Sequence, residues 1–270
     1  MSKGQNFGSI EFMNEDCVVV SYPKSGNTWM RFLIFSYLFD RQATFEDVKK
    51  TMPYIPPEWR SETTSVLSKI THLVFKSHEN WPQRYSKVIY IVRDPRDIVL
   101  SLYFWHRKTG FFDMPENKAI SDGEYIDKFL FSSYLWPVPW DKHVEGWIDG
   151  GDKLSGSFLF VKYENMLANI KTQFRRVIDF LGLQLDQQKL ERAISRCSLS
   201  KMQQVENKRK NEIPFARKGK SGQWEGVLNQ TIVRQFSERF GSTMEKMGYR
   251  TPISNELSEQ SHSPMIIPLR

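Results

Sequence analysis

Cys17-Val18-Val19-Val20-Ser21-Tyr22-Pro23-Lys24-Ser25-Gly26-Asn27-Thr28-Trp29 is the stretch in which the periodicity of the chain changes. The apolar residues before Pro23 show no 3.6-residue period, which is typical of a strand buried on both faces. After Thr28 the pattern has helical spacing, carried by Trp29, Phe32, Leu33, Phe35, Ser36 and Phe39. The stretch therefore predicts a buried strand, a tight turn over residues 23–27 and a buried helix.

The same order of strand and helix recurs twice along the chain. Residues 87–92 are predicted to form a buried strand, with Pro95 at the start of the helical run 98–107. Residues 158–161 are predicted to form another strand, followed by a helical pattern over 166–181. Strands that alternate with helices form parallel sheets with helices on both faces.

The sequence thus predicts an α/β fold with a central parallel sheet flanked by helices and a P-loop-like strand-turn-helix site for a nucleotide. We expect residues 1–270 to form a single domain, with 251–270 as a flexible tail or loose strap. The chain is 40% apolar and 14% aromatic, which excludes a disordered or fibrous protein.

The composition also bounds where the protein works. No run approaches the roughly 20 apolar residues of a membrane-spanning helix, and the first residues lack the apolar core of a signal peptide. We therefore expect a soluble, unexported, cytoplasmic protein with no membrane partner. Cys17 and Cys197 stand far apart and have no metal or redox spacing, so both are expected to be reduced structural thiols.

The positive charge of the chain is concentrated in one segment. The net charge is +7, and residues 201–220 hold seven basic and two acidic residues. A local cluster favours a site for an anionic ligand over a nucleic-acid footprint, although a solvated basic loop has the same composition.

The turn over residues 23–27 has the features of an anion site. Backbone N–H groups at a helix N-terminus point outward, with the positive end of the helix dipole behind them. Gly26 permits close approach of the backbone, and Lys24 adds a mobile cation. The stretch is not a Walker A loop, which has two glycines spaced by four residues and a lysine after the second. A helix with a glycine in its first turn and no ligand is the alternative.

Two further stretches carry cations beside polar residues. Residues 93–101 place Arg93 just before a helix and Ser101 about two turns into it. Asp94 and Asp97 could instead cap that helix and pair with neighbouring arginines at the surface. Residues 217–224, Arg-Lys-Gly-Lys-Ser-Gly-Gln-Trp, could wrap a phosphate or form a solvated basic turn.

These three stretches, in this order, resemble the cofactor motifs of the cytosolic sulfotransferase family over roughly residues 18–224. The family signature Tyr-Pro-Lys-Ser-Gly-Thr-x-Trp differs here only by Asn27. The resemblance implies binding of 3′-phosphoadenosine 5′-phosphosulfate (PAPS), with its 5′ end at the turn and Lys24 at the bridging oxygen. The implied donor-binding residues are Lys24, Ser25, Gly26, Asn27, Thr28, Trp29, Arg93, Ser101, Tyr163, Arg217, Lys218 and Gly219.

A general base cannot be chosen by sequence physics alone, since the chain has five histidines: His72, His78, His106, His143 and His262. Lys76-Ser77-His78 resembles the Lys-Thr-His of the family, which implies that His78 removes the acceptor proton and that Lys76 acts at the sulfuryl group. Trp29 and Tyr163 match aromatic residues that hold the adenine base. The family's short dimer motif is not matched after Trp224, so the oligomeric state stays open.

The resemblance therefore predicts that the protein is a PAPS-dependent sulfotransferase. It would transfer a sulfuryl group to a hydroxyl, or to an amine or amide nitrogen, of a small molecule, and release 3′-phosphoadenosine 5′-phosphate (PAP). The catalytic residues would be His78, Lys24 and Lys76, with no metal. Aromatic residues in 103–105, 111–112 and 134–140 could line the acceptor pocket or belong to the core. A P-loop kinase and a non-catalytic binder of nucleic acid are the alternatives.

Overall fold

The computed structural model describes residues 16–54, 74–81, 85, 87–154, 157–207 and 219–251. The elements before the middle of the chain are β1 (Cys17–Ser21), α1 (Asn27–Phe39), α2 (Phe45–Thr51), β2 (Val74–Ser77), β3 (Lys87–Val92), α4 (Pro95–Lys108), η2 (Phe111–Asp113) and α5 (Asp122–Phe131). They are followed by α6 (Trp140–Gly151), η3 (Asp152–Leu154), β4 (Phe158–Lys162), α7 (Tyr163–Ala168), α8 (Ile170–Phe180), α9 (Gln187–Arg196), α10 (Leu199–Asn207), η4 (Gln223–Gly226) and α11 (Gln230–Lys246).

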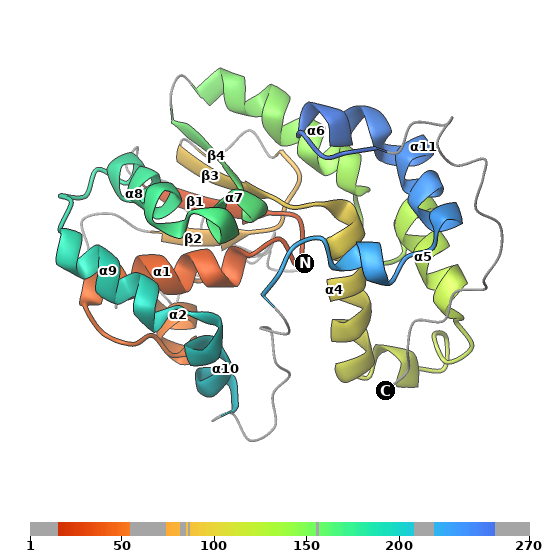
Figure 1. The fold of residues 1–270 in the computed structure, drawn as a ribbon, viewed down its shortest axis with the longest axis horizontal. Helices are drawn as coiled ribbons and strands as arrows, with labels where there is room; N and C mark the ends of the chain where they lie inside the picture. Colours follow the sequence, from red (N-terminus) through yellow and green to blue (C-terminus); the bar gives the residue numbers. More distant parts are fainter. Residues whose placement is uncertain are drawn as a thin grey trace, which may run out of the picture.

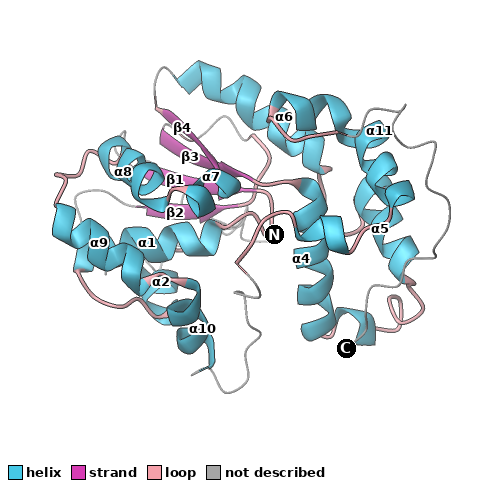
Figure 2. Ribbon diagram, viewed as in Figure 1, coloured by secondary structure: helices cyan, strands magenta, loops and turns pink. Residues whose placement is uncertain are grey.

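The four strands form one parallel sheet in the order β2-β1-β3-β4 (Figure 2). Side chains of β1 alternate between two cores, since Val18 and Val20 belong to one and Cys17 and Val19 to the other. Helices α1, α2, α8 and α9 cover one face, and α4, α5, α6 and α11 pack on the other (Figure 1). The predicted α/β fold with a flanked parallel sheet is therefore confirmed.

The strand-turn-helix units lie where the sequence predicted them, with two differences. The helical pattern over 166–181 is two helices, α7 and α8, because the backbone leaves the helical region at Asn169 (φ −149°, ψ 73°). Asn169 then caps α8 by accepting from the N–H of Thr172. The apolar residues Val74 and Phe75 continue into Lys76 and Ser77 as β2, an edge strand that pairs with β1.

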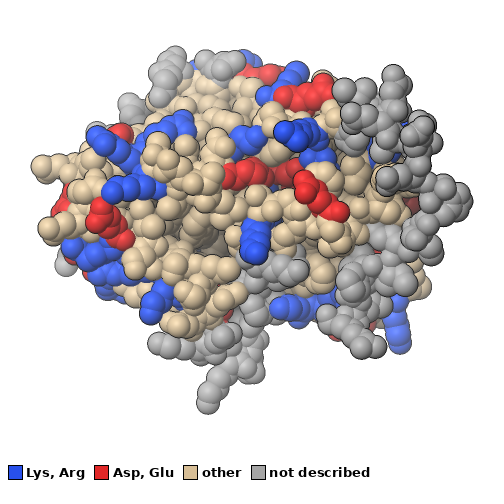
Figure 3. Space-filling model, in the orientation of Figure 1, with Lys and Arg blue, Asp and Glu red and all other residues tan. Residues whose placement is uncertain are grey.

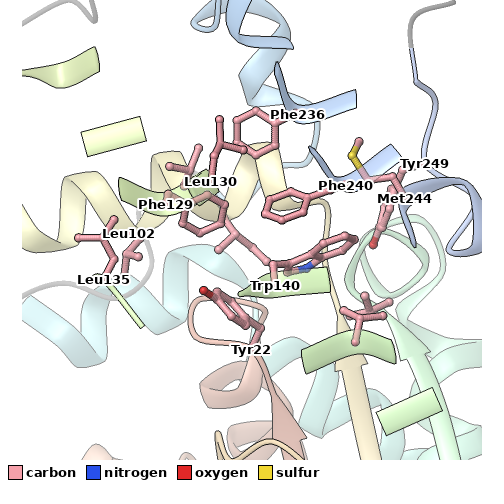
Figure 4. Packing of buried hydrophobic residues seen from close by; sticks show 14 of the residues in the cluster. Tyr22, Leu102, Phe129, Leu130, Leu135, Trp140, Phe236, Phe240, Met244 and Tyr249 are labelled. Carbon is pink, nitrogen blue, oxygen red and sulfur yellow. The ribbon is translucent and has the colours of Figure 1, made fainter. Parts of the chain in front are cut away.

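The first core reaches the turn after β1. Tyr22 is buried and lies edge-on to Phe129 of α5, in the same core as Trp140 of α6 (Figure 4). Phe236 and Phe240 of α11 complete the aromatic packing behind these rings. The turn is thus held between the sheet and a layer of helices, which limits its movement.

Some expectations fall on residues outside the described parts of the chain. They include most of the tail over 251–270, of which residue 251 alone is described. Among the helices in the described parts, none combines the length and hydrophobicity needed to cross a bilayer.

Candidate active site

A cavity of about 430 Å³ lies at the carboxyl ends of the parallel strands. Parallel α/β folds bind ligands at this edge of the sheet. The cavity collects residues from sequence motifs that are more than 100 positions apart. The sequence-predicted residues that line it are Lys24, Gly26, Asn27, Thr28, Trp29, Lys76, His78, Arg93, Ser101, Tyr163 and Gly219.

The turn between β1 and α1 has the backbone of an anion site. Lys24 and Gly26 both adopt left-handed conformations, with φ of 66° and 103°. Gly26 is the N-cap residue and has no side chain to accept from the first-turn N–H groups. Ser25 Oγ is buried and has no hydrogen-bond partner among the described residues. These polar groups suit an anionic ligand that accepts hydrogen bonds.

Asn27 has a structural use that the sequence did not reveal. Its amide donates to the carbonyl of Val19 (2.9 Å) and accepts from Arg31 Nε (3.1 Å). Arg31 also donates to the carbonyl of Met52. The side chain of Asn27 is thus engaged inside the fold, and its backbone N–H remains in the first turn of α1.

Arg93 ties two sides of the cavity together. Its guanidinium donates to the carbonyls of Lys24 (3.0 Å) and Lys220 (3.3 Å), and it lies 4.3 Å above the ring of Tyr163. Asp97 is 3.7 Å from Arg93 and accepts from the N–H of Gly222. One arginine-aspartate pair therefore joins the β1 turn to the segment that follows residue 218.

The cap and the ion pairs of the alternative interpretation are present at the start of α4, but they do not lie at the surface. Asp94 does cap the helix and pairs with Arg96 at 2.7 Å, but both side chains are buried. The ring of Trp224 covers the Arg96 guanidinium at 3.7 Å. The non-local contact with Trp224 removes these groups from water, which spacing along α4 cannot reveal.

Trp29 and Tyr163 form an aromatic wall of the cavity. Their rings meet edge-on at 5.9 Å, and Trp29 Nε1 donates to the carbonyl of Cys197. A Cβ at Gly26 would lie 2.7 Å from Tyr163 Cδ2, so only glycine permits this approach at position 26. Leu167 and Met202 extend the wall.

His78 is held in one orientation at the end of β2. Its Nδ1 lies 2.7 Å from the carbonyl oxygen of Ser21, which can only accept a hydrogen bond, so Nδ1 carries the hydrogen. Nε2 is then the proton acceptor of the neutral ring. Burial, followed by the charge of Lys76, holds the pKa of His78 well below its ordinary value. The imidazole is therefore neutral at pH 7 and able to take a proton.

The other histidines are placed differently. His106 lines the cavity, but its Nδ1 is bonded to the Tyr125 hydroxyl (2.7 Å) and its ring stacks on Phe111. His143 is fully buried and is not among the described residues that line the cavity. His72 and His262 lie outside the described residues. His78 alone of these three described histidines stands beside Lys76 at a strand end.

Two half-buried lysines, Lys24 and Lys76, give the cavity its charge. Burial, together with the charge of Arg93, lowers the pKa of Lys24 to about 8, although Glu206 opposes the shift. Burial, with Arg31 and Lys24, lowers the pKa of Lys76 to about 7. A bound anion would offset these repulsions, so the site is electrostatically prepared for a negatively charged group.

The cavity also has an apolar part. Trp136 lies edge-on to His78 at 5.9 Å, and Trp105 contacts Lys24 Nζ at 5.4 Å. Leu102 and Leu135 line the same space. Trp105 and Trp136 belong to the aromatic segments that the sequence analysis could place either in the acceptor pocket or in the core. Tyr103, from the first of these segments, is part of the core.

Arg217 and Lys218, which the sequence assigned to the 3′-phosphate, lie outside the described residues. Gly219, the next residue, lines the cavity with a left-handed backbone (φ 55°). Within the described ranges, no group of three or more His, Cys, Asp or Glu is arranged to hold a metal ion.

An anion-binding backbone and a neutral imidazole in one cavity are the parts that a group-transfer enzyme acting on an anionic substrate needs. Comparison with known proteins gives the family. Residues 14–248 match the model of the sulfotransferase domain, so the chain belongs to the sulfotransferase family and is an enzyme of that kind.

The relatives are distant but cover most of the chain. Sulfotransferase 2B1 of Mus musculus is 26% identical over 98% of this chain and 80% of its own length. Amine sulfotransferase of Oryctolagus cuniculus is 22% identical over 89% of this chain and 84% of its own length.

Solved structures show the same fold. Mouse sulfotransferase SULT7A1 complexed with PAP has a TM-score of 0.65 and 23% identity, with 87% of this chain and 86% of that chain covered. Retinol dehydratase in a complex with retinol and PAP has a TM-score of 0.68 and 20% identity, with 90% and 84% covered.

Proposed function

We propose that this sulfotransferase moves a sulfuryl group from PAPS to a hydroxyl, or to an amine or amide nitrogen, of a small-molecule acceptor. The observation that carries the proposal is the meeting of three distant motifs at one cavity. The turn of Lys24, the helix start at Arg93 and the strand end at His78 lie around the same space. A single ligand with separated anionic groups would contact all three.

The residues present fit the nucleotide donor. Gly26 lets the Tyr163 ring pack directly against the turn, and as the N-cap of α1 it offers no side-chain acceptor to the first-turn N–H groups. Ser25 Oγ is buried without a partner in the described chain, and Arg93 Nε is in the same state. Buried polar atoms are normally hydrogen-bonded, so both are suited to a ligand.

The donor would be held from its two ends. Lys24 and residues 25–28 would bind the 5′ end, and Arg93, Ser101 and Gly219 would bind the 3′-phosphate. Trp29 and Tyr163 would hold the adenine base, and we expect Arg217 and Lys218 to complete the 3′ site. When bound, the nucleotide supplies an activated sulfuryl group.

The protein's own contribution is to position charges and to accept one proton. His78 Nε2 would take the proton of the acceptor nucleophile, while Nδ1–H stays bonded to Ser21 and holds the ring. Lys24 and Lys76 would stabilise negative charge that builds up during transfer. Both lysines are half-buried, and the burial that lowers their pKa values also strengthens their electrostatic interactions relative to water.

The apolar part of the cavity supports a small-molecule acceptor. Trp105, Trp136, Leu102 and Leu135 provide apolar surface beside the polar groups, as ligand sites usually do. The cytoplasmic location stays a prediction from the sequence. On the face seen in Figure 3, the Lys and Arg side chains of the described residues are interspersed with Asp and Glu.

A transfer assay with labelled PAPS tests the proposal. The acceptor panel should include phenols, alcohols, steroids, amines and amides. We expect label to move to at least one acceptor and PAP to form in equal amount. ATP with Mg²⁺ in place of PAPS is the control, and turnover with ATP without transfer from PAPS would indicate a kinase instead.

A further inference from the structure

Residues 78–81, which follow β2 and include His78, contact helix α6. His143 Nε2 lies 3.3 Å from the carbonyl oxygen of His78. Trp147 Nε1 donates to the carbonyl oxygen of Glu79 at 2.8 Å. Residues four apart share one face of a helix, so a single face of α6 supplies donors to two successive carbonyls. Both carbonyls follow directly after β2.

The same face of α6 approaches this segment unusually closely. A Cβ at Gly146 would lie 2.8 Å from Asn80 Oδ1, and one at Gly150 would lie 2.2 Å from Trp81 Cδ2. The Asn80 side chain is exposed and its end can move, but the Trp81 ring cannot make room for a Cβ at 2.2 Å, so Gly150 lets the helix lie against this segment. The distance between His143 and His78 depends on this packing.

The hydrogen of His143 is placed by its two neighbours. The carbonyl of His78 can only accept, so the hydrogen is on Nε2, and Nδ1 accepts from the Tyr90 hydroxyl at 2.9 Å. Tyr90 and His143 are both fully buried, and the Tyr22 ring closes the third side edge-on at 5.5 Å. Burial lowers the pKa of His143 to about 4, in keeping with a neutral ring.

We propose that His143 is a positioning residue that fixes the backbone of His78, with Tyr90 setting the tautomer in which His143 donates. His78 is then anchored twice, at its ring through Ser21 and at its carbonyl through His143. Nδ1 and the backbone carbonyl are then both engaged, and Nε2 is the ring nitrogen left for the acceptor. The inference rests on the proposed function, since positioning matters only if His78 acts on the acceptor.

Two substitutions separate the two ring nitrogens of His143. His143→Gln places an amide nitrogen near the Nε2 position and keeps the donor to His78. His143→Asn reaches only the Nδ1 position, so it keeps an acceptor for Tyr90 and loses the donor. We expect kcat to stay within a few-fold of the wild type in the Gln variant. In the Asn variant kcat should fall by up to about 100-fold, the cost of a small displacement of a reacting group.

The binding constants separate positioning from a general defect. KM for the acceptor and the affinity for PAP should stay near the wild-type values in both variants, because His143 does not line the cavity. Trp147→Phe is the matched control, since it removes the neighbouring donor on the same helix face. It should lower the melting temperature and leave kcat near the wild-type value. Equal loss of kcat in the Gln and Asn variants would overturn the proposal.

A readout without turnover distinguishes failure of this inference from failure of the proposed function. The ¹⁵N shifts of the His78 ring report which nitrogen carries the hydrogen. Wild type and His143→Gln should show the Nδ1–H form. His143→Asn should show a mixture, because movement of the His78 backbone would loosen the contact of Nδ1 with the Ser21 carbonyl. An unchanged spectrum in the Asn variant would overturn the positioning role, whether or not transfer from PAPS is observed.

Tyr90→Phe serves if His143→Asn does not fold. It removes one hydroxyl and keeps the ring that packs against His143. The freed Nδ1 can then carry the hydrogen, so the donor to His78 is lost in part. We expect a smaller fall in kcat and the same kind of mixed His78 spectrum. Wild-type kcat and spectrum in this variant would exclude a role of Tyr90 in setting the tautomer.

Discussion

Lys24, Lys76 and His78 are coupled by their charges as well as by their common cavity. Lys24 contributes to the lowered pKa of Lys76, and Lys76 contributes to the lowered pKa of His78. The charge of Lys76 favours the neutral His78 that the proposed reaction needs. The charge of Lys24 disfavours the protonated Lys76 that the reaction needs, and a bound anion would offset this repulsion. The protonation of the free enzyme differs from that of the donor complex.

The pH dependence of kcat/KM follows from these shifts. His78 is active when neutral, so the acid limb should lie below pH 6.5. Lys76 is active when protonated, and its pKa of about 7 places an alkaline limb near neutrality in the free enzyme. Lys76→Arg should move this limb upward, because a guanidinium stays charged. An alkaline limb at the same pH in the Arg variant would show that Lys76 does not cause it.

Ser101 and Thr28 should distinguish the two ends of the donor. Ser101→Ala removes one hydroxyl from the proposed 3′ site, so it should weaken PAP by about 10-fold, the worth of one hydrogen bond, and leave adenosine 5′-phosphosulfate unaffected. Thr28→Val is the matched control at the 5′ end and should weaken both nucleotides. Titration calorimetry measures the four affinities. Equal weakening of both nucleotides by Ser101→Ala would contradict its assignment to the 3′-phosphate.

At the scale of elements, the strand-turn-helix units were predictable because the sequence signals that define each unit lie within that unit. The periodicity change at Pro23 and the proline at the start of α4 lie in the elements that they define. The break between α7 and α8 at Asn169 was missed, because the apolar spacing continues through it.

Contacts between elements were not predictable from spacing. Asp97 binds backbone N–H groups of Gly222 and Trp224, more than 120 positions away. The side chain of Asn27 was expected to contact the phosphate, and in the structure it donates a hydrogen bond to the carbonyl of Val19 in β1. His143 was one of five candidates for the general base. Its proposed role comes instead from its contact with the carbonyl of His78, which sequence spacing does not reveal.

The packing of α6 on the His78 segment gives a prediction about glycine. Gly150→Ala should displace Trp81 and destabilise the fold by about 1–3 kcal/mol, the usual cost of overpacking. Gly241→Ala in α11 is the control, because the nearest atom to its Cβ would be 4.0 Å away. It should be neutral or stabilising by up to about 1 kcal/mol. Urea unfolding measures both, and equal stability of the two variants would contradict the close contact with Trp81.

At the scale of the whole molecule, the cavity lies where motifs from both helical layers meet. Lys24 and Trp29 belong to the side of α1, and Arg93 and Trp105 to the side of α4 (Figure 1). Arg93 connects the two through the carbonyl of Lys24. A nucleotide that contacts both layers would therefore stabilise the fold as a unit.

PAP should raise the unfolding free energy by roughly 2.7 kcal/mol at 100 times its dissociation constant. The change is measured as the shift of the thermal transition with PAP concentration. ATP is the comparison, since it lacks the 3′-phosphate. A clear response to ATP and none to PAP would contradict the donor assignment.

Substitution of His78 by Asn is the most direct test of the central claim, because it separates binding from chemistry. His78→Asn keeps a polar side chain and removes the titrating nitrogen, so PAP affinity and thermal stability should persist. Turnover with PAPS should fall by roughly 10²–10⁴-fold, and the acid limb of the pH profile should disappear. Wild-type turnover in a folded, PAP-binding His78→Asn protein would show that His78 is not the base and would contradict the account.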